Sequence, residues 1–239
     1  MATTNPTSGS DIPPTEITTS ALDPDHLSTP ALQNPIPHIS IIAGYRPGIL
    51  GRTLEMHLDH YSKLNGWGAD FEADMAVGLS SLIKRLDEPI NEAWSAVMAV
   101  PAPSLIPGLP QQQQQQQQRV ERTVGVIFIN GERPDGEAEG VARLRAFIVD
   151  ESARGLGVGR KLFAAAMEFV RSVGFRECQL YTLRSSVEAI GMYERGGFRE
   201  VGEKLAEWYG KEHSAVQFSW LRERDEQGGD QVVQDSKAP

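Results

Sequence analysis

One stretch of this sequence constrains the fold more than any other: an apolar strand that runs into a glycine-rich turn and then into a long helix. It reads Phe147-Ile-Val-Asp-Glu-Ser-Ala-Arg-Gly-Leu-Gly-Val-Gly-Arg-Lys161. Backbone amides at the start of a helix lack partners, and the helix dipole places about half a positive charge there. Since glycines let a ligand approach the backbone, the turn predicts a phosphate or pyrophosphate site. Arg154, Arg160 and Lys161 could add cationic contacts.

The glycine spacing excludes the two commonest phosphate-binding motifs. A P-loop that begins at Gly155 requires a second glycine at position 160, which is Arg160. A dinucleotide-binding fingerprint requires its third glycine at position 160 or 162, and these positions hold Arg160 and Leu162. The pattern that remains is Arg154-x-x-Gly157-x-Gly159.

Hydrophobic periodicity predicts the helices and strands around this turn. Helices are expected at 49–64, 71–86, 157–173 and 186–195. Strands are expected at 94–100, 123–129, 144–149, 178–183 and 215–221. Two helices, a run of strands and then alternating strands and helices indicate an α/β body with a mixed sheet.

Composition divides the chain into a folded body and two tails. Residues 1–40 are rich in Pro, Thr and Ser, contain four acids and no Lys or Arg, and are expected to be disordered. Residues 223–239 form a second acidic segment expected to be disordered, which leaves 41–222 as the folded domain. Within that domain, 101–119 contains four prolines and then Gln111 to Gln118. This polyglutamine tract predicts a loop insertion, either tolerated as such or used as an interaction tract.

Composition also bounds the function. The net charge is −9, but the tails account for −4 and −3 of it, so the body is close to neutral. Such a chain is not expected to bind nucleic acid, which needs clustered cations. One cysteine excludes a disulfide framework, and no membrane span or signal peptide is expected. The expected location is intracellular, either cytoplasmic or nuclear.

Two motifs resemble the GNAT superfamily of N-acetyltransferases. The pattern from Arg154 to Gly159 is similar to that family's acyl-CoA-binding motif, and Ala189-Ile-Gly-Met-Tyr-Glu-Arg-Gly-Gly-Phe198 is similar to its second conserved block. The segment from His57 to Trp67 resembles the first helices of GNAT domains that some bacteria fuse to MarR-type regulators, although no DNA-binding portion is recognised in this sequence. The resemblance implies a mixed, mostly antiparallel central sheet flanked by helices.

The resemblance also implies the residues that hold acetyl-CoA, the expected acyl donor. The pantetheine arm would pair with the strand edge Phe147-Ile148-Val149, and a hydrogen-bonding residue would stand at Ser186, where the family often has Asn. The pyrophosphate would lie on the amides of one continuous run, which is Arg154, Gly155, Leu156, Gly157, Val158, Gly159 and Arg160.

The implied reaction is transfer of an acetyl group to a primary amine that attacks the thioester directly in a ternary complex. Tyr193 matches the family tyrosine that acts as general acid toward the departing sulfur. No general base is identified; Glu55, Asp59, Glu72 and a water chain are candidates, and each acid could equally be a solvated helix charge. The alternative function is a non-catalytic acyl-CoA-binding regulatory module. The acceptor amine and the oligomeric state are not predicted.

The remaining candidate residues each allow a structural interpretation. His57 and His60 share one helix face, but no third ligand has matching spacing, so no metal site is expected. Tyr61 and Trp67 are expected either to line the acceptor pocket or to pack in the core. Cys178 alternates with Leu180 on a strand and is expected to be a buried apolar residue.

Overall fold

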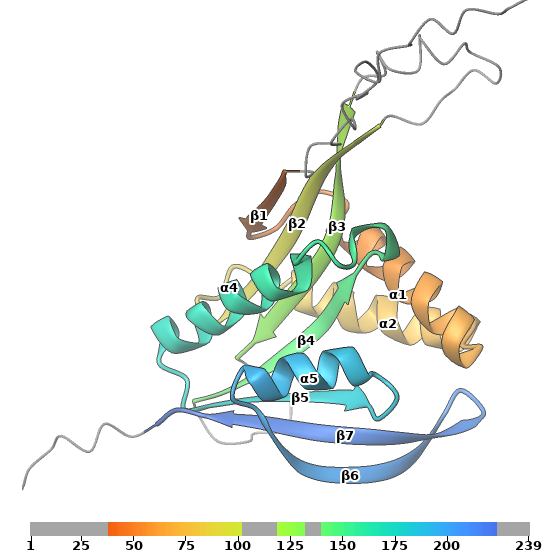
Figure 1. Cartoon of the computed structure of the whole chain (residues 1–239), viewed down its shortest axis with the longest axis vertical. Coiled ribbons are helices and arrows are strands. Elements are labelled where there is room, and N and C mark those ends of the chain that lie inside the picture. The colour runs from red at the N-terminus through yellow and green to blue at the C-terminus, as the bar shows by residue number, and fades with distance from the viewer. Residues whose placement is uncertain (1–37, 102–118, 132–139, 224–239) are drawn as a thin grey trace, which may run out of the picture. The chain divides into compact units, whose positions relative to one another are not determined.

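Seven strands form one sheet in the order β1-β2-β3-β4-β5-β7-β6 (Figure 1). The structure is a computed structural model, and it describes residues 38–101, 119–131 and 140–223. All neighbouring strands are antiparallel except β4 and β5, which are parallel. The elements, in chain order, are β1 (Ile39–Ala43), α1 (Ile49–Asn65), α2 (Ala69–Ile83), β2 (Asn91–Pro101), β3 (Arg119–Asn130), β4 (Val141–Val149), the 3₁₀ turn η1 (Glu151–Ala153), α4 (Val158–Val173), β5 (Glu177–Leu183), α5 (Val187–Arg195), β6 (Arg199–Trp208) and β7 (Lys211–Leu221).

The expected mixed, mostly antiparallel sheet with flanking helices is confirmed, but two strands were not predicted. β1 begins at Ile39, inside the segment 1–40 that the sequence marks as disordered. Hydrophobic periodicity does not predict β6, because most of its residues are exposed and a register shift between Glu200 and Gly202 interrupts the alternation of its side chains. The tails up to residue 37 and from residue 224 lie outside the described residues, as do residues 102–118 of the insertion expected at 101–119. The two end residues of that insertion belong to strands instead, since Pro101 ends β2 and Arg119 begins β3.

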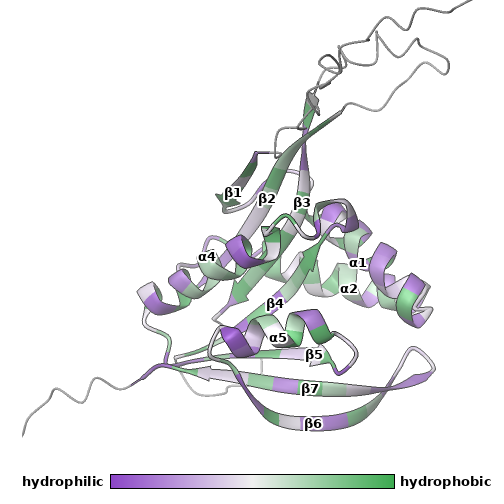
Figure 2. Cartoon of the chain, in the orientation of Figure 1, coloured by the Kyte–Doolittle hydropathy of each residue, from purple (hydrophilic) through white to green (hydrophobic). Residues whose placement is uncertain are grey.

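Helices cover both faces of the sheet (Figure 1). On one face, Leu162 and Val170 of α4 pack with Ile127 and Ile129 of β3. On the other face, helices α1 and α2 pack on the intervening β3 residues, Val126 and Phe128. From Val124 to Ile129, β3 is buried on both sides, and its residues there are apolar in succession apart from Gly125; Figure 2 shows green along this part of the sheet.

β4 and β5 diverge soon after they pair. Their register contains only three residue pairs, from Val141 opposite Glu177 to Arg143 opposite Gln179. Further along, β4 carries a bulge, because two residues lie between the partners of Val126 and Phe128, and one of them, Ala146, has φ 46°. The bulge bends β4, and the edge that faces β5 has no strand partner from Leu144 to Val149 within the described ranges.

Other single-residue expectations can be compared directly with the structure. Cys178 is fully buried in the core beneath α4, as expected from its strand alternation. Trp67 is also buried, and it packs with Phe71 and Leu183. No helix in the part of the chain that the structure describes is both long and apolar enough to cross a bilayer.

Gly196, at the end of α5, packs closely against the Phe163 ring of α4. Its φ of −81° suits any residue, but an added Cβ would overlap the Phe163 ring and lie 2.6 Å from that ring's Cζ. We expect Gly196→Ala to lower the free energy of unfolding by about 1–3 kcal/mol through overpacking. Gly51→Ala in α1 is the control, since a Cβ there meets nothing within 4 Å and should stabilise the helix by up to about 1 kcal/mol. Equal urea midpoints for the two variants would contradict this packing.

His57 makes stability depend on pH in a defined window. Its ring is buried, Nδ1 donates to the Thr53 carbonyl oxygen at 2.8 Å, and burial lowers its pKa to about 4. Between pH 6.5 and 4 the unfolded chain therefore binds a proton at His57 that the folded chain does not bind. Hence the free energy of unfolding should fall as pH falls through this window, by up to about 1.4 kcal/mol per pH unit from this residue.

The matched variant is His57→Asn, whose amide can keep the bond to Thr53 but cannot ionise. Urea unfolding from pH 7.5 to 4.5 should show the wild-type advantage over this variant constant above pH 7 and shrinking below pH 6.5. An advantage that is the same at every pH would show that His57 is not held neutral in the folded chain.

Candidate active site

The glycine loop between β4 and α4 presents unpaired backbone amides. Gly155 and Gly157 both have φ 77°, a left-handed conformation that favours glycine, and Gly157 is the N-cap of α4. Within the described residues, the amides of Gly155, Leu156 and Gly157 donate to no backbone carbonyl. The first amides of α4 follow them with the positive end of the helix dipole. The loop can therefore bind an anion.

The loop is anchored at one residue and open elsewhere. Val158 is buried in the core, whereas Arg154, Gly155, Leu156 and Arg160 are exposed. A Cβ added at Gly155 would meet nothing within 4 Å, whereas one added at Gly157 would lie 3.6 Å from the Arg160 guanidinium, so the space beside Gly155 is open and Arg160 stands beside Gly157. The run expected to hold pyrophosphate thus has accessible amides, and its position is fixed by the buried Val158 side chain.

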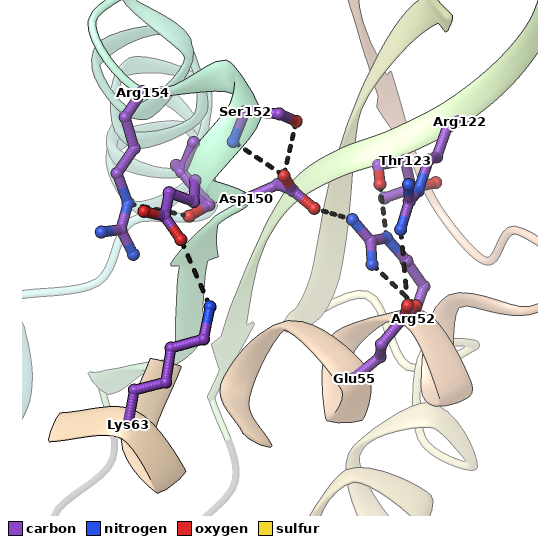
Figure 3. A network of polar contacts seen from close by, with 10 residues as sticks. Arg52, Glu55, Lys63, Arg122, Thr123, Asp150, Ser152 and Arg154 are labelled. Atoms are coloured by element: carbon purple, nitrogen blue, oxygen red, sulfur yellow. Dashed lines mark hydrogen bonds and ion pairs between the residues drawn. The ribbon is translucent and has the colours of Figure 1, made fainter. Parts of the chain in front are cut away.

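Arg52 of α1 ties the start of this loop to the rest of the domain (Figure 3). Its Nε donates to the Thr123 carbonyl oxygen at 2.8 Å, and its Nη2 pairs with the Asp150 carboxylate, which also accepts from the Ser152 amide at 2.9 Å. Burial alone would raise the pKa of Asp150, but the hydrogen bonds from Ser152 and Arg52 outweigh it and lower that pKa. Since the Arg52 side chain is only 10% exposed, solvent competes little for these contacts.

Glu55, a candidate base, belongs to the same network. Its carboxylate lies 2.7 Å from Arg52 and 3.4 Å from Arg122 (Figure 3). The other two candidates, Asp59 and Glu72, are exposed on α1 and α2. The structure therefore brings none of the three acids into either of the cavities described below.

Arg154 and His60 form a second link between the loop and α1. The Arg154 guanidinium donates to the Val149 carbonyl oxygen at 3.3 Å and lies 3.1 Å from His60 Nδ1. Burial, and then the Arg154 charge, lower the pKa of His60, which leaves the imidazole neutral and able to accept that bond. Within the described ranges, no three His, Cys, Asp or Glu side chains are grouped as metal ligands, and His57 bonds to its own helix.

The open edge of β4 meets the glycine loop and α5. A Cβ added at Gly159 would lie 3.7 Å from Phe147, 3.8 Å from Val149 and 3.8 Å from the Met192 sulfur. Phe147 and Val149 thus stand beside the first turn of α4, and Ile148 is buried on the α1–α2 face. The three residues expected to hold the pantetheine arm lie on the strand edge that lacks a partner.

Tyr193 of α5 is buried beside this edge. Its ring packs against four phenylalanine rings with centroid separations of 6.0–6.4 Å, and these belong to Phe147, Phe163, Phe198 and Phe218. Burial raises the pKa of Tyr193, and neighbouring Tyr61 raises it further. Its hydroxyl forms no hydrogen bond with any described residue. Ser186, the N-cap of α5, also makes no side-chain capping bond.

An aromatic cluster lies where α1 ends and α2 begins. It joins α1 and α2 to the β6–β7 turn and consists of Tyr61, Trp67, Phe71, Trp208, Tyr209 and His213. Trp67 donates from Nε1 to His213 Nε2 at 3.0 Å, and Tyr61 stacks on Trp67 at 5.0 Å. Trp67 is buried, which supports core packing, whereas Tyr61 is half-buried. Neither lines the two cavities described below, and a place for either in an acceptor pocket stays a prediction.

Two cavities open where β4 diverges from β5. The strand cavity, of about 320 Å³, is lined by Arg143, Leu144, Arg145, Ala146, Gln179, Leu180 and Tyr181. The helix cavity, of about 180 Å³, is lined by Phe71, Asp74, Met75, Gly78, Leu79, Leu82, Arg145, Ala146 and Tyr209. Sequence reasoning did not identify Arg143 and Arg145. Their spacing of two within an apolar strand was the available signal, because it places both on one sheet face.

The sequence matches a known family over this part of the chain. Residues 118–198 match the model described as the acetyltransferase (GNAT) family. A mycothiol acetyltransferase from Geodermatophilus obscurus is 30% identical over 105 residues, which are 44% of this chain and 30% of that protein. The uncharacterized N-acetyltransferase YjgM from Escherichia coli is 35% identical over 70 residues, 29% of this chain and 42% of that protein. The chain thus spans less than half the length of these relatives.

Solved structures share the fold at lower identity. A ribosomal-protein-alanine N-acetyltransferase from Brucella melitensis has a TM-score of 0.54 at 16% identity, over 77% of this chain and 99% of that chain. A GCN5-related N-acetyltransferase from Kribbella flavida has a TM-score of 0.54 at 18% identity, over 77% and 98%. The two comparisons agree: residues 118–198 match the acetyltransferase (GNAT) family model, and the described domain shares the fold of these N-acetyltransferases.

Proposed function

We propose that this protein is an N-acyltransferase that moves an acetyl group from acetyl-CoA to a primary amine within a ternary complex. The observation that carries the proposal is the junction of unpaired amides at the start of α4 with the unpaired edge of β4. The family match over residues 118–198 supports acyl transfer in general, and the open loop and strand edge support a donor site between them.

The glycine loop fits the phosphates of an acyl-CoA. The amides of Gly155, Leu156 and Gly157 have no backbone acceptor in the described chain, and no side chain fills the space outside Gly155. The loop would hold the pyrophosphate through these amides and those of the first α4 turn, with Arg160 exposed beside them. The Arg52–Asp150 pair would keep the loop in place without touching the ligand.

The β4 edge would hold the rest of the donor. Amides and carbonyls from Phe147 to Val149 can pair with an amide-bearing arm as a further strand would. When bound, the acyl-CoA supplies the thioester. A β4 amide that donates to its carbonyl oxygen would stabilise the negative charge that develops there during attack.

Tyr193 would act on the sulfur. Because burial raises its pKa, the phenol stays protonated at physiological pH and is a weaker acid than a thiol of pKa about 8.5. Its role is therefore to donate a hydrogen bond to the developing thiolate, while the proton that the sulfur finally takes up is the one released by the attacking amine. The free hydroxyl and the rigid phenylalanine surroundings suit this role.

The direct test is thiol release from acetyl-CoA in the presence of a panel of primary amines. Amine-dependent release supports acyl transfer. Tight CoA binding without release under any amine would overturn it and favour the non-catalytic binding module.

Gly157→Glu tests the anion site. A carboxylate at the N-cap of α4 would stand where the phosphates are expected, so we predict at least a hundredfold loss of CoA affinity by calorimetric titration. Gly157→Ala is the matched control, because it introduces the same left-handed strain of about 1–2 kcal/mol without a charge. Undiminished CoA affinity in Gly157→Glu would disprove the site.

Tyr193→Phe tests the hydrogen bond to sulfur. The variant keeps the ring that packs among the phenylalanines but removes the hydroxyl, so we predict a loss in kcat of about tenfold to a hundredfold with CoA affinity unchanged. Tyr45→Phe, at an exposed tyrosine before α1, should leave both values unchanged. An unaltered kcat in Tyr193→Phe would remove this residue from the reaction.

A further inference from the structure

Two arginines line the strand cavity from the same side of β4. Arg143 and Arg145 are two residues apart before the bulge, and Ala142 and Leu144, the residues that alternate with them, pack in the core beneath α4. The arginines therefore face the opposite side of the sheet, where Gln179 and Tyr181 of β5 complete the lining. Arg145 also lines the helix cavity, so the two spaces share this side chain.

Within the part of the chain that the structure describes, neither arginine has an acidic partner. No carboxylate there forms an ion pair with Arg143 or Arg145, and Nε of Arg143 is buried without a hydrogen-bond partner. Arg52 and Arg184, in contrast, are paired with Asp150 and with Glu200 and Glu203. A buried unsatisfied donor is costly, and two adjacent cations without a counter-charge repel each other.

The surroundings make this pair a net positive site. Burial lowers the pKa of Arg145, as do the charges of Arg143 and Arg85. The nearby acids form no ion pair with the arginines in the described chain: Asp74, in the helix cavity, accepts from the Tyr209 hydroxyl at 3.2 Å, and Glu177 accepts from the Ser219 hydroxyl at 2.7 Å. No described acid is among the charges that shift the pKa of Arg145.

We propose that the acceptor is an amine that carries an oxyanion, and that Arg143 and Arg145 bind this oxyanion in the strand cavity. The inference rests on the proposed acyl transfer, because it names the class of acceptor for the same site. Guanidinium groups bind carboxylates and phosphates in a planar, two-point manner, which also satisfies the buried Nε. A cavity of about 320 Å³ is at the small end of ligand pockets, so the acceptor is a small molecule. Ala146 of the bulge lines this cavity and borders the β4 edge, where the acyl group would lie.

Matched amine pairs test the acceptor class. In the thiol-release assay, 4-aminobutanoate is compared with 4-aminobutanamide, and 2-aminoethyl phosphate with ethanolamine. We expect the anionic member of at least one pair to have a kcat/KM at least tenfold higher, and the pair that shows it distinguishes carboxylate from phosphate. A ratio near one, or below one, for both pairs overturns the inference.

Variants assign the effect to the arginines. Arg145→Gln and Arg143→Gln should each bring the anionic-to-neutral ratio of kcat/KM down about tenfold, and Arg145→Lys should recover part of it. The control is Arg199→Gln on β6, which removes an exposed arginine that lines neither cavity and should leave the ratio unchanged. An unchanged ratio in both glutamine variants at the β4 positions overturns the inference.

A binding measurement separates this inference from the proposed function. If no amine supports thiol release, acyl transfer fails, and calorimetric titration of the whole protein with butanoate and with inorganic phosphate decides the oxyanion site. Binding that Arg145→Gln weakens at least tenfold supports the site. No binding, or equal binding to wild type, Arg145→Gln and Arg199→Gln, overturns it.

Discussion

The separation of β4 from β5 is the constraint on which the rest of the site depends. Three residue pairs join these strands, and beyond Arg143 no described strand pairs with the backbone groups along this edge of β4. A buried backbone donor or acceptor without a partner costs about 1–3 kcal/mol, so such an edge favours a ligand that can pair with it. The bulge at Ala146 maintains the opening, because a β4 without it would continue straight alongside its neighbour.

The sheet separates two halves of the proposed reaction. The glycine loop, α4 and Tyr193 of α5 lie with one layer of the core, whereas the arginine pair faces the layer of α1 and α2 (Figure 1). On this proposal, donor and acceptor approach from opposite faces and meet only where the strands part. Arg52 spans the two layers, since it extends from α1 to the β3 carbonyl and the loop carboxylate.

The elements that could be predicted from sequence are those with strong periodicity or a motif. The α4 stripe and the glycine turn before it are local signals, and α4 was expected to end at Val173, where it does end. β6 could not be recognised, because an exposed edge strand with a shifted register has no apolar alternation. The role of Glu55 could not be inferred either, since its partner Arg122 is 67 residues away in sequence. The arginine pair was visible as a spacing, but only the fold shows that no acid among residues 38–101, 119–131 and 140–223 forms an ion pair with it.

The pairing of β2 with β3 has a consequence for how this gene can change. Pro101 and Arg119 are register partners, so the seventeen residues between them enter and leave the fold at neighbouring points of one hairpin. Because the entropy of closing a loop grows only with the logarithm of its length, a change in the number of residues between these two partners would cost little stability. The distance in sequence between β2 and β3 can therefore vary while the register of β2 with β3, and of β3 with β4, stays the same.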